Sequence, residues 1–230
     1  MPKEANLYAR VGRFARTQFG LWLVKHKVGT RLGNIDVVGV HEAGSHFSSS
    51  GELFAIEVKE EGARFLASVG QALAYTVYVH YPYLAVRMRR RRAFSQEEKD
   101  AAAGFGVGLI AVGSRRCTLI STARRFEPED RHVLHMYSRL AVFRCSLCGS
   151  VFKESEVVGI NQPGAIDIPS DPTYAGAFRK AIVKRKHVRY WVYELARQRK
   201  ESGSYVFDRR YICRDCSSIF ASLIPKLPGA

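Results

Sequence analysis

The chain has 230 residues, of which 47% are hydrophobic, 11% aromatic and 25% charged, a composition that excludes a wholly disordered or collagen-like protein. Lys and Arg number 36 against 21 Asp and Glu, so the formal net charge is +15, which is typical of a protein with a polyanionic partner. No apolar stretch is long enough to span a bilayer, and none follows the N-terminus as in a secretion signal. We therefore expect a cytoplasmic protein that does not insert into a membrane.

The first part of the chain alternates helix-like and strand-like patterns. Hydrophobic spacing and turn residues predict a helix over 3–19, strands over 22–28, 35–40 and 52–59, a helix over 63–78, a strand over 83–86, a helix capped by Ser95, and strands over 107–112 and 117–121. This order predicts an α/β domain with a mixed β-sheet flanked by helices, spanning residues 1–127.

The pattern changes after Pro128, and residues 128–230 form a second predicted region. A helix over 129–138 and a strand over 142–148 precede a stretch rich in Pro, Gly and Asp. Asp171 and Pro172 are a suitable N-cap and first residue for a long basic helix over 173–200, which a strand over 205–213 follows. We expect this region to be small and basic.

Three charged residues stand on two predicted strands of one hairpin. Asp36 begins the first strand, and Glu57 and Lys59 lie two apart on the second, so these last two side chains point to one face while Ile56 and Val58 enter the core. Two neighbouring carboxylates repel each other unless a cation lies between them, and hard oxygen ligands suit Mg²⁺ or Mn²⁺. A lysine beside such a metal can orient or help deprotonate an attacking water.

On these residues the sequence resembles the PD-(D/E)XK nuclease superfamily, in particular its RecB-like members. Gly33-Asn34-Ile35-Asp36 is similar to the first half of the motif, although isoleucine replaces the proline of the family's name. Gln71 and Tyr75 match the Gln-x-x-x-Tyr element on the following helix, and their spacing places both on one helical face. Glu4, in the N-terminal helix, matches an additional acidic ligand; a glutamate in a first helical turn can also serve only the helix dipole, and Gln71 and Tyr75 can belong to an ordinary half-buried helix.

The resemblance implies a restriction-endonuclease-like fold and a Mg²⁺-dependent or Mn²⁺-dependent deoxyribonuclease. It implies Glu4, Asp36 and Glu57 as metal ligands, and Asp36, Glu57, Lys59, Gln71 and Tyr75 as the catalytic set. The expected products are a 5′-phosphate and a 3′-hydroxyl. The alternative is a non-catalytic DNA-binding or complex-assembly protein that keeps the fold. A homodimer and a monomer both fit, and the preferred DNA sequence or structure stays open.

Two Cys-x-x-Cys pairs lie in the second region. Cys145 with Cys148 and Cys213 with Cys216 each present two thiolates from a tight turn, and together they complete a tetrahedral site for a structural Zn²⁺. Residues 142–144 and 210–212 are the flanking strands of this predicted zinc ribbon. Because such a site has no open position, we expect its zinc to be structural; the fifth cysteine, Cys117, is expected to be a buried small hydrophobe.

Runs of basic residues are the predicted DNA contacts. A charge run is often only a solvated surface, but beside a phosphodiester-cleaving motif it favours a phosphate-binding role. The candidates are Arg87, Arg89, Arg90, Arg91, Arg92, Lys180, Lys184, Lys186 and Arg189.

Overall fold

The computed structural model describes residues 5–43, 50–88, 93–144, 150–153, 190–198 and 205–213. The chain divides into two compact units, one of residues 1–43 and 51–140 and the other of residues 44–50 and 141–230. Within the described part, no helix combines the length and the apolar character needed to cross a membrane.

A mixed six-stranded sheet forms the centre of the first unit. Its order is β1-β2-β3-β4-β5-β6, with β1 and β2 antiparallel, β3, β4 and β5 parallel, and β5 and β6 antiparallel. The elements are α1 (Ala5–Phe19), β1 (Leu23–Thr30), β2 (Gly33–Ala43), β3 (Ser50–Lys59), α2 (Phe65–Ala74), a short 3₁₀ helix η1 (Tyr75–Val77), β4 (Tyr81–Arg87), α3 (Gln96–Phe105), β5 (Gly108–Val112), β6 (Cys117–Ser121) and α4 (Asp130–Leu140). The predicted α/β class with a mixed, helix-flanked sheet is confirmed.

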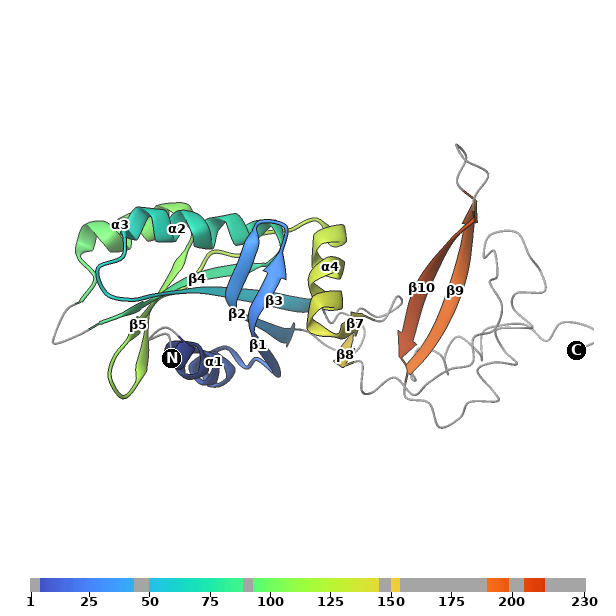
Figure 1. Ribbon diagram of the computed structural model, residues 1–230, viewed down its shortest axis with the longest axis horizontal. Coiled ribbons are helices and arrows are strands. Elements are labelled where there is room, and N and C mark those ends of the chain that lie inside the picture. The colour runs from blue at the N-terminus through green and yellow to red at the C-terminus, as the bar shows by residue number, and fades with distance from the viewer. Residues whose placement is uncertain are drawn as a thin grey trace, which may run out of the picture. The chain divides into compact units, whose positions relative to one another are not determined.

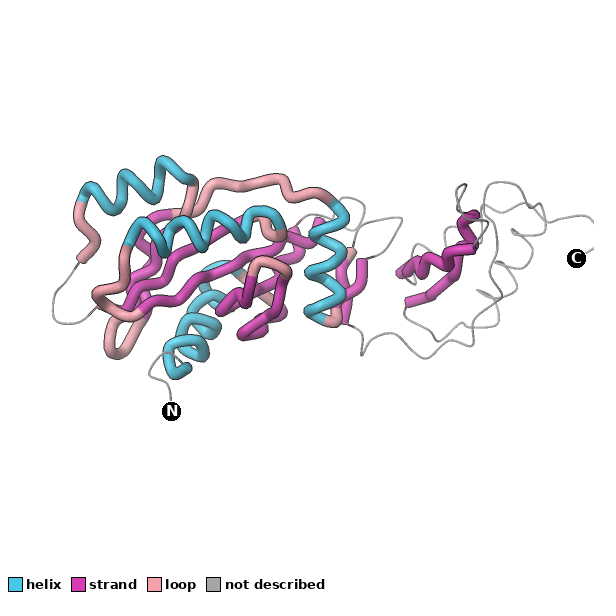
Figure 2. The backbone as a smooth tube through the Cα atoms, turned by 45° about the horizontal axis from the view of Figure 1, so that its top comes forward, coloured by secondary structure: helices cyan, strands magenta, loops and turns pink. Residues whose placement is uncertain are grey.

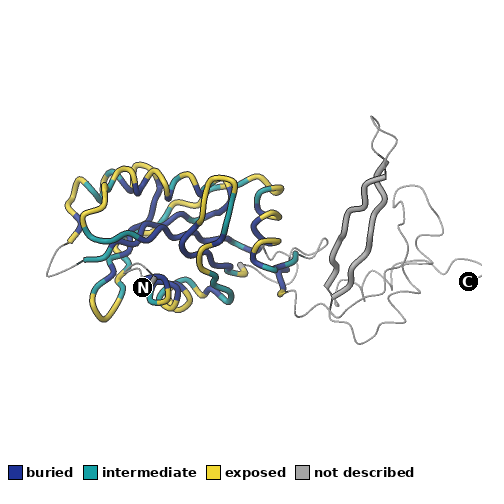
Figure 3. Tube along the Cα trace, in the orientation of Figure 1, coloured by how far each residue is buried: buried dark blue, intermediate teal, exposed yellow. Residues whose placement is uncertain are grey.

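The two faces of the sheet carry different helices, with α1 on one side and α2 and α3 on the other (Figure 1; Figure 2). Alternate residues of β4 show this division, because Tyr83 and Ala85 belong to the cluster with α1, whereas Leu84 and Val86 belong to the cluster with α2 and α3. Figure 3 shows buried residues along the central strands and exposed residues on the outer sides of the helices. The core therefore has two layers, one on each face of the sheet.

Local signals place both ends of α3. Ser95 caps α3 in a reciprocal capping box with Glu98, as its sequence predicts, and Gly106 ends the helix with φ 74°. In α4 the buried residues Val133, Met136, Tyr137 and Leu140 follow the helical period. Cys117 is only partly buried against the α1 cluster, so its prediction as a buried residue holds in part.

The described residues of the second unit include two pairs of antiparallel strands. Strands β7 (Val142–Arg144) and β8 (Val151–Lys153) pair, with the rings of Phe143 and Phe152 5.9 Å apart. Strands β9 (Tyr190–Gln198) and β10 (Tyr205–Cys213) pair over their whole lengths. The predicted strand over 205–213 and both strands predicted to flank the cysteine pairs are confirmed.

The predicted helix over 173–200 is wrong where the structure describes it. Residues 190–198 form strand β9, and residues 173–189 lie outside the described part. The segment begins Tyr190-Trp191-Val192-Tyr193, and aromatic and β-branched residues favour strands. Pairing with β10 supplies hydrogen-bond partners for the backbone of β9. These partners outweigh the helical preference predicted from the basic segment that precedes the strand.

Candidate functional site

Asp36 lies on β2 and is 4% exposed. Its Oδ2 accepts a hydrogen bond of 2.9 Å from the backbone N–H of Val58 on β3, and its Oδ1 accepts one of 2.5 Å from Nζ of Lys27 on β1. An unpaired buried carboxylate is costly, so these two donors offset its burial. Three neighbouring strands thus hold this carboxylate.

Glu57 is the second buried carboxylate, with 3% of its surface exposed. Its Oε1 lies 2.5 Å from Nζ of Lys59, and its Oε2 accepts a hydrogen bond of 2.5 Å from the hydroxyl of Tyr75. Along β4, Glu57 is level with Leu84 and Lys59 with Val86, which both belong to the cluster with α2 and α3. The predicted common face of Glu57 and Lys59 is therefore confirmed.

The hydroxyl of Tyr75 links the two strands that carry the carboxylates. Besides its bond to Glu57, it lies 3.3 Å from the backbone oxygen of Asn34 on β2. Burial raises the pKa of Tyr75 well above its ordinary value, and the hydrogen bond to Glu57 and the charges of Glu57 and Asp36 raise it further. Tyr75 is therefore a neutral donor that fixes the orientation of Glu57.

The other two predicted members of the site are Gln71 and Glu4. Gln71 lies on α2 and is exposed, and the contacts described for Asp36 and Glu57 come from other residues. The four-residue spacing predicts a common helical face with Tyr75, but α2 ends at Ala74 and Tyr75 begins the tighter helix η1. Glu4 lies outside the described residues. In the described part of the chain, no third His, Cys, Asp or Glu joins the two carboxylates.

Lys27 is a site residue that the sequence analysis missed. Its neighbours His26 and Val28 pair with Val37 and Ile35, so Lys27 stands directly across from Asp36. Burial lowers the pKa of Lys27, but its hydrogen bonds to Asp36 and to Tyr8 outweigh this, and the net direction is upward. The signal that finds the pair is the register: Thr30 pairs with Gly33 at the turn, and counting three residues outward from each places Lys27 across from Asp36.

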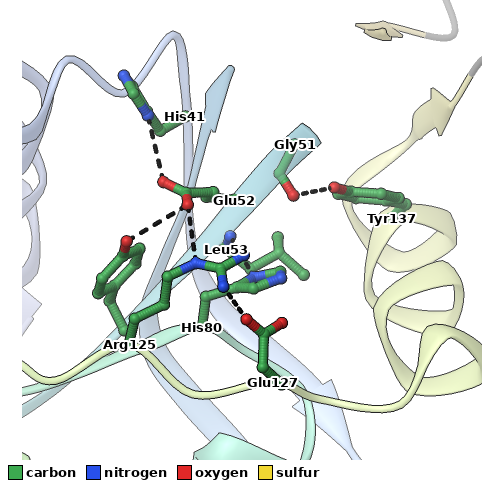
Figure 4. A network of polar contacts seen from close by, with 9 residues as sticks. His41, Gly51, Glu52, Leu53, His80, Arg125, Glu127 and Tyr137 are labelled. Atoms are coloured by element: carbon green, nitrogen blue, oxygen red, sulfur yellow. Dashed lines mark hydrogen bonds and ion pairs between the residues drawn. The ribbon is translucent and has the colours of Figure 1, made fainter. Parts of the chain in front are cut away.

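A second polar network joins the start of β3 to the segment after β6 (Figure 4). The carboxylate of Glu52, 13% exposed, accepts hydrogen bonds from Nε of Arg125 at 3.1 Å and from the hydroxyl of Tyr81 at 3.3 Å. In α4, the hydroxyl of Tyr137 donates to the backbone oxygen of Gly51 at 2.5 Å. These contacts bind the segment that leads into α4 to the sheet, so we assign this network to the stability of the first unit.

The predicted DNA-binding and zinc-binding residues fall mostly outside the described part. Arg87 is described, and its guanidinium contacts both carboxylate oxygens of Glu60, at 3.0 and 3.2 Å. Cys213 is the last residue of β10. The predicted residues that lie outside are Arg89, Arg90, Arg91, Arg92, Lys180, Lys184, Lys186, Arg189, Cys145, Cys148 and Cys216.

Comparisons with known proteins name no activity for the chain. No family model matches it, and no curated protein matches it. A similar solved structure is that of the SPO1766 protein of unknown function from Silicibacter pomeroyi, with a TM-score of 0.44 and 18% identity over 61% of this chain and 85% of that chain.

Proposed function

We propose that the chain is a metal-dependent deoxyribonuclease related to the PD-(D/E)XK nucleases, with Asp36 and Glu57 as metal ligands. The observation that supports this most strongly is that two buried carboxylates on neighbouring strands each bind a lysine ammonium at 2.5 Å. Carboxylate oxygens that already hold cations in a buried site have the chemistry that Mg²⁺ or Mn²⁺ requires. Glu4 is the proposed third ligand.

A divalent ion bound there would supply positive charge to the scissile phosphate and lower the pKa of a coordinated water. The chain's own residues have separate tasks. Val58 orients Asp36 through its backbone N–H, and Tyr75 orients Glu57 through its hydroxyl. Lys59, whose side chain is 23% exposed, reaches solvent while it contacts Glu57, so it is the residue suited to orient the attacking water.

DNA is the proposed substrate because the site would act on a phosphodiester and the chain carries a net charge of +15. Arg87 at the end of β4, the basic candidates that follow it and those in the second unit are the proposed phosphate contacts. Cys145, Cys148, Cys213 and Cys216 are the proposed ligands of one structural Zn²⁺, supported by the strands β7 and β10 that run into the two cysteine pairs. Family resemblance gives the products as a 5′-phosphate and a 3′-hydroxyl.

Cleavage of plasmid and single-stranded DNA in Mg²⁺ or Mn²⁺ tests the proposal. Wild type and Lys25→Met should cut at similar rates, whereas Asp36→Asn and Lys59→Met should lose activity by a factor of 100 or more, on the order of what general acid–base and metal contributions supply. Lys25 is a matched control because it lies on β1 and carries the same charge as Lys59. Equal cutting by all four proteins would refute the assignment.

Calorimetric titration with Mn²⁺ separates the nuclease from the non-catalytic alternative. Heat of binding in the wild type that disappears in Asp36→Asn supports the metal centre. Tight DNA binding with no Mn²⁺ binding and no cleavage would support a DNA-binding or assembly role for the same fold.

A further inference from the structure

The contact between Lys27 and Asp36 has an unusual balance of exposure. The lysine side chain is 49% exposed and the aspartate side chain 6%, yet Nζ lies 2.5 Å from Oδ1. A half-exposed lysine gains little from an ordinary ion pair and loses side-chain freedom when it is held. The main effect of the pair is therefore to offset the cost of burying the Asp36 carboxylate.

The backbone also fits this special position. Lys27 has φ 52° within β1, the left-handed region that residues other than glycine rarely adopt. Such a conformation persists only where the surroundings compensate for it, and it is concentrated at functional sites. The ring of Tyr8 on α1 adds a cation–π contact, with its centroid 4.6 Å from Nζ. The ammonium is thus held by α1 and β2 together.

The net charge of the two carboxylates and two ammonium groups limits how a divalent ion can bind. Asp36 and Glu57 contribute two negative charges and Lys27 and Lys59 two positive charges, so the described site is neutral without a metal. A divalent ion on the same carboxylates would meet two ammonium groups at close range, an arrangement with excess positive charge. Lys59 has a task in the proposed reaction, whereas Lys27 is the more exposed of the two, so water can solvate its ammonium if the contact with Asp36 breaks.

We propose that Lys27 is a resident cation of the site, which occupies Oδ1 of Asp36 in the metal-free protein and gives up that oxygen when a divalent ion binds. This inference rests on the proposed function, since it assumes that Asp36 is a metal ligand. In this role Lys27 is a positioning residue: it holds Asp36 in place in the metal-free protein, and it lowers the affinity of the site for a metal ion. A purely structural ion pair would act differently, because its removal would loosen Asp36 and leave the metal affinity unchanged or weaker.

Calorimetric titration of the full chain with Mn²⁺, without DNA, tests the proposal. Lys27→Met should bind Mn²⁺ about tenfold more tightly than the wild type, because it removes a positive charge a few ångströms from a divalent ion. Lys25→Met should change the affinity by less than about twofold, because Lys25 pairs with Val38 and the ammonium contacts described for Asp36 and Glu57 come from Lys27 and Lys59. Metal-free Lys27→Met should melt at a lower temperature than the wild type and recover most of the difference in Mn²⁺.

Equal or weaker Mn²⁺ binding by Lys27→Met, with clear binding by the wild type, would overturn this inference and leave the proposed metal centre standing. Absence of Mn²⁺ binding in all three proteins would overturn both. Acetylation of the wild type, read by mass spectrometry, gives a test that needs no variant. Mg²⁺ should increase labelling of Lys27 several-fold and leave Lys25 unchanged, and equal labelling of Lys27 with and without Mg²⁺ would contradict the displacement.

Discussion

Replacing Tyr75 with phenylalanine removes one hydroxyl and keeps the buried ring. That hydroxyl donates to Oε2 of Glu57 at 2.5 Å, and Glu57 is 3% exposed, so water does not readily replace the lost donor. A hydrogen bond to a charged acceptor contributes about 1.5–3 kcal/mol, so we expect Tyr75→Phe to lower the free energy of unfolding by about 2 kcal/mol. Under the proposed function, Glu57 also loses the group that orients it, and Mn²⁺ affinity should fall at least about tenfold.

Tyr137→Phe is the matched control, because it removes a tyrosine hydroxyl that donates to a neutral acceptor, the backbone oxygen of Gly51. Tyr137 is 2% exposed and lies outside the carboxylate site, so this variant should cost about 1 kcal/mol and leave Mn²⁺ affinity unchanged. Urea unfolding followed by circular dichroism gives the free energies, and calorimetry gives the affinities. A Tyr75→Phe variant as stable as the wild type, with the same Mn²⁺ affinity, would refute the role assigned to this hydroxyl.

Three further predictions concern the rest of the molecule. Glu52→Gln removes the charged acceptor of the network in Figure 4 and should cost about 1–2 kcal/mol in urea unfolding, whereas Glu127→Gln, whose side chain is 72% exposed, should cost almost nothing. Burial raises the pKa of Tyr83, so the folded protein keeps the proton of this phenol to a higher pH than the unfolded chain, whose tyrosines ionise at about pH 10. Stability should therefore fall as the pH rises above about 10, and less steeply in Tyr83→Phe, as urea unfolding at pH 8 and pH 11 would show; equal slopes would contradict this. Purified wild type should carry about one Zn²⁺ per chain, and Cys213→Ser/Cys216→Ser should lose the metal and bind DNA more weakly; metal analysis that finds no zinc in the wild type would count against the ribbon.

Most elements of the first unit could be predicted because the local preferences of their residues agree with the tertiary structure. Ser95 with Glu98 marks the start of α3 by hydrogen bonds that need no distant partner, and the structure has that cap. Strand β9 is the counterexample. Its first residues, Tyr190-Trp191-Val192-Tyr193, favour a strand, but they follow a basic stretch with helical spacing, and the pairing with β10 decides that they are extended. A pattern read along one segment contains no information on such a distant partner.

The same distinction explains which parts of the site the sequence predicted. Glu57 and Lys59 are two apart on one strand, so strand geometry alone places them together. Tyr75 reaches Glu57 from a different element, and the family motif was needed to select it. Lys27 belongs to no motif, and its partnership with Asp36 follows only from the register of β1 on β2. A motif alone therefore does not describe such a metal site, because a lysine across the hairpin can already occupy a ligand oxygen. The strength of that lysine contact sets how strongly a metal ion must bind to replace it.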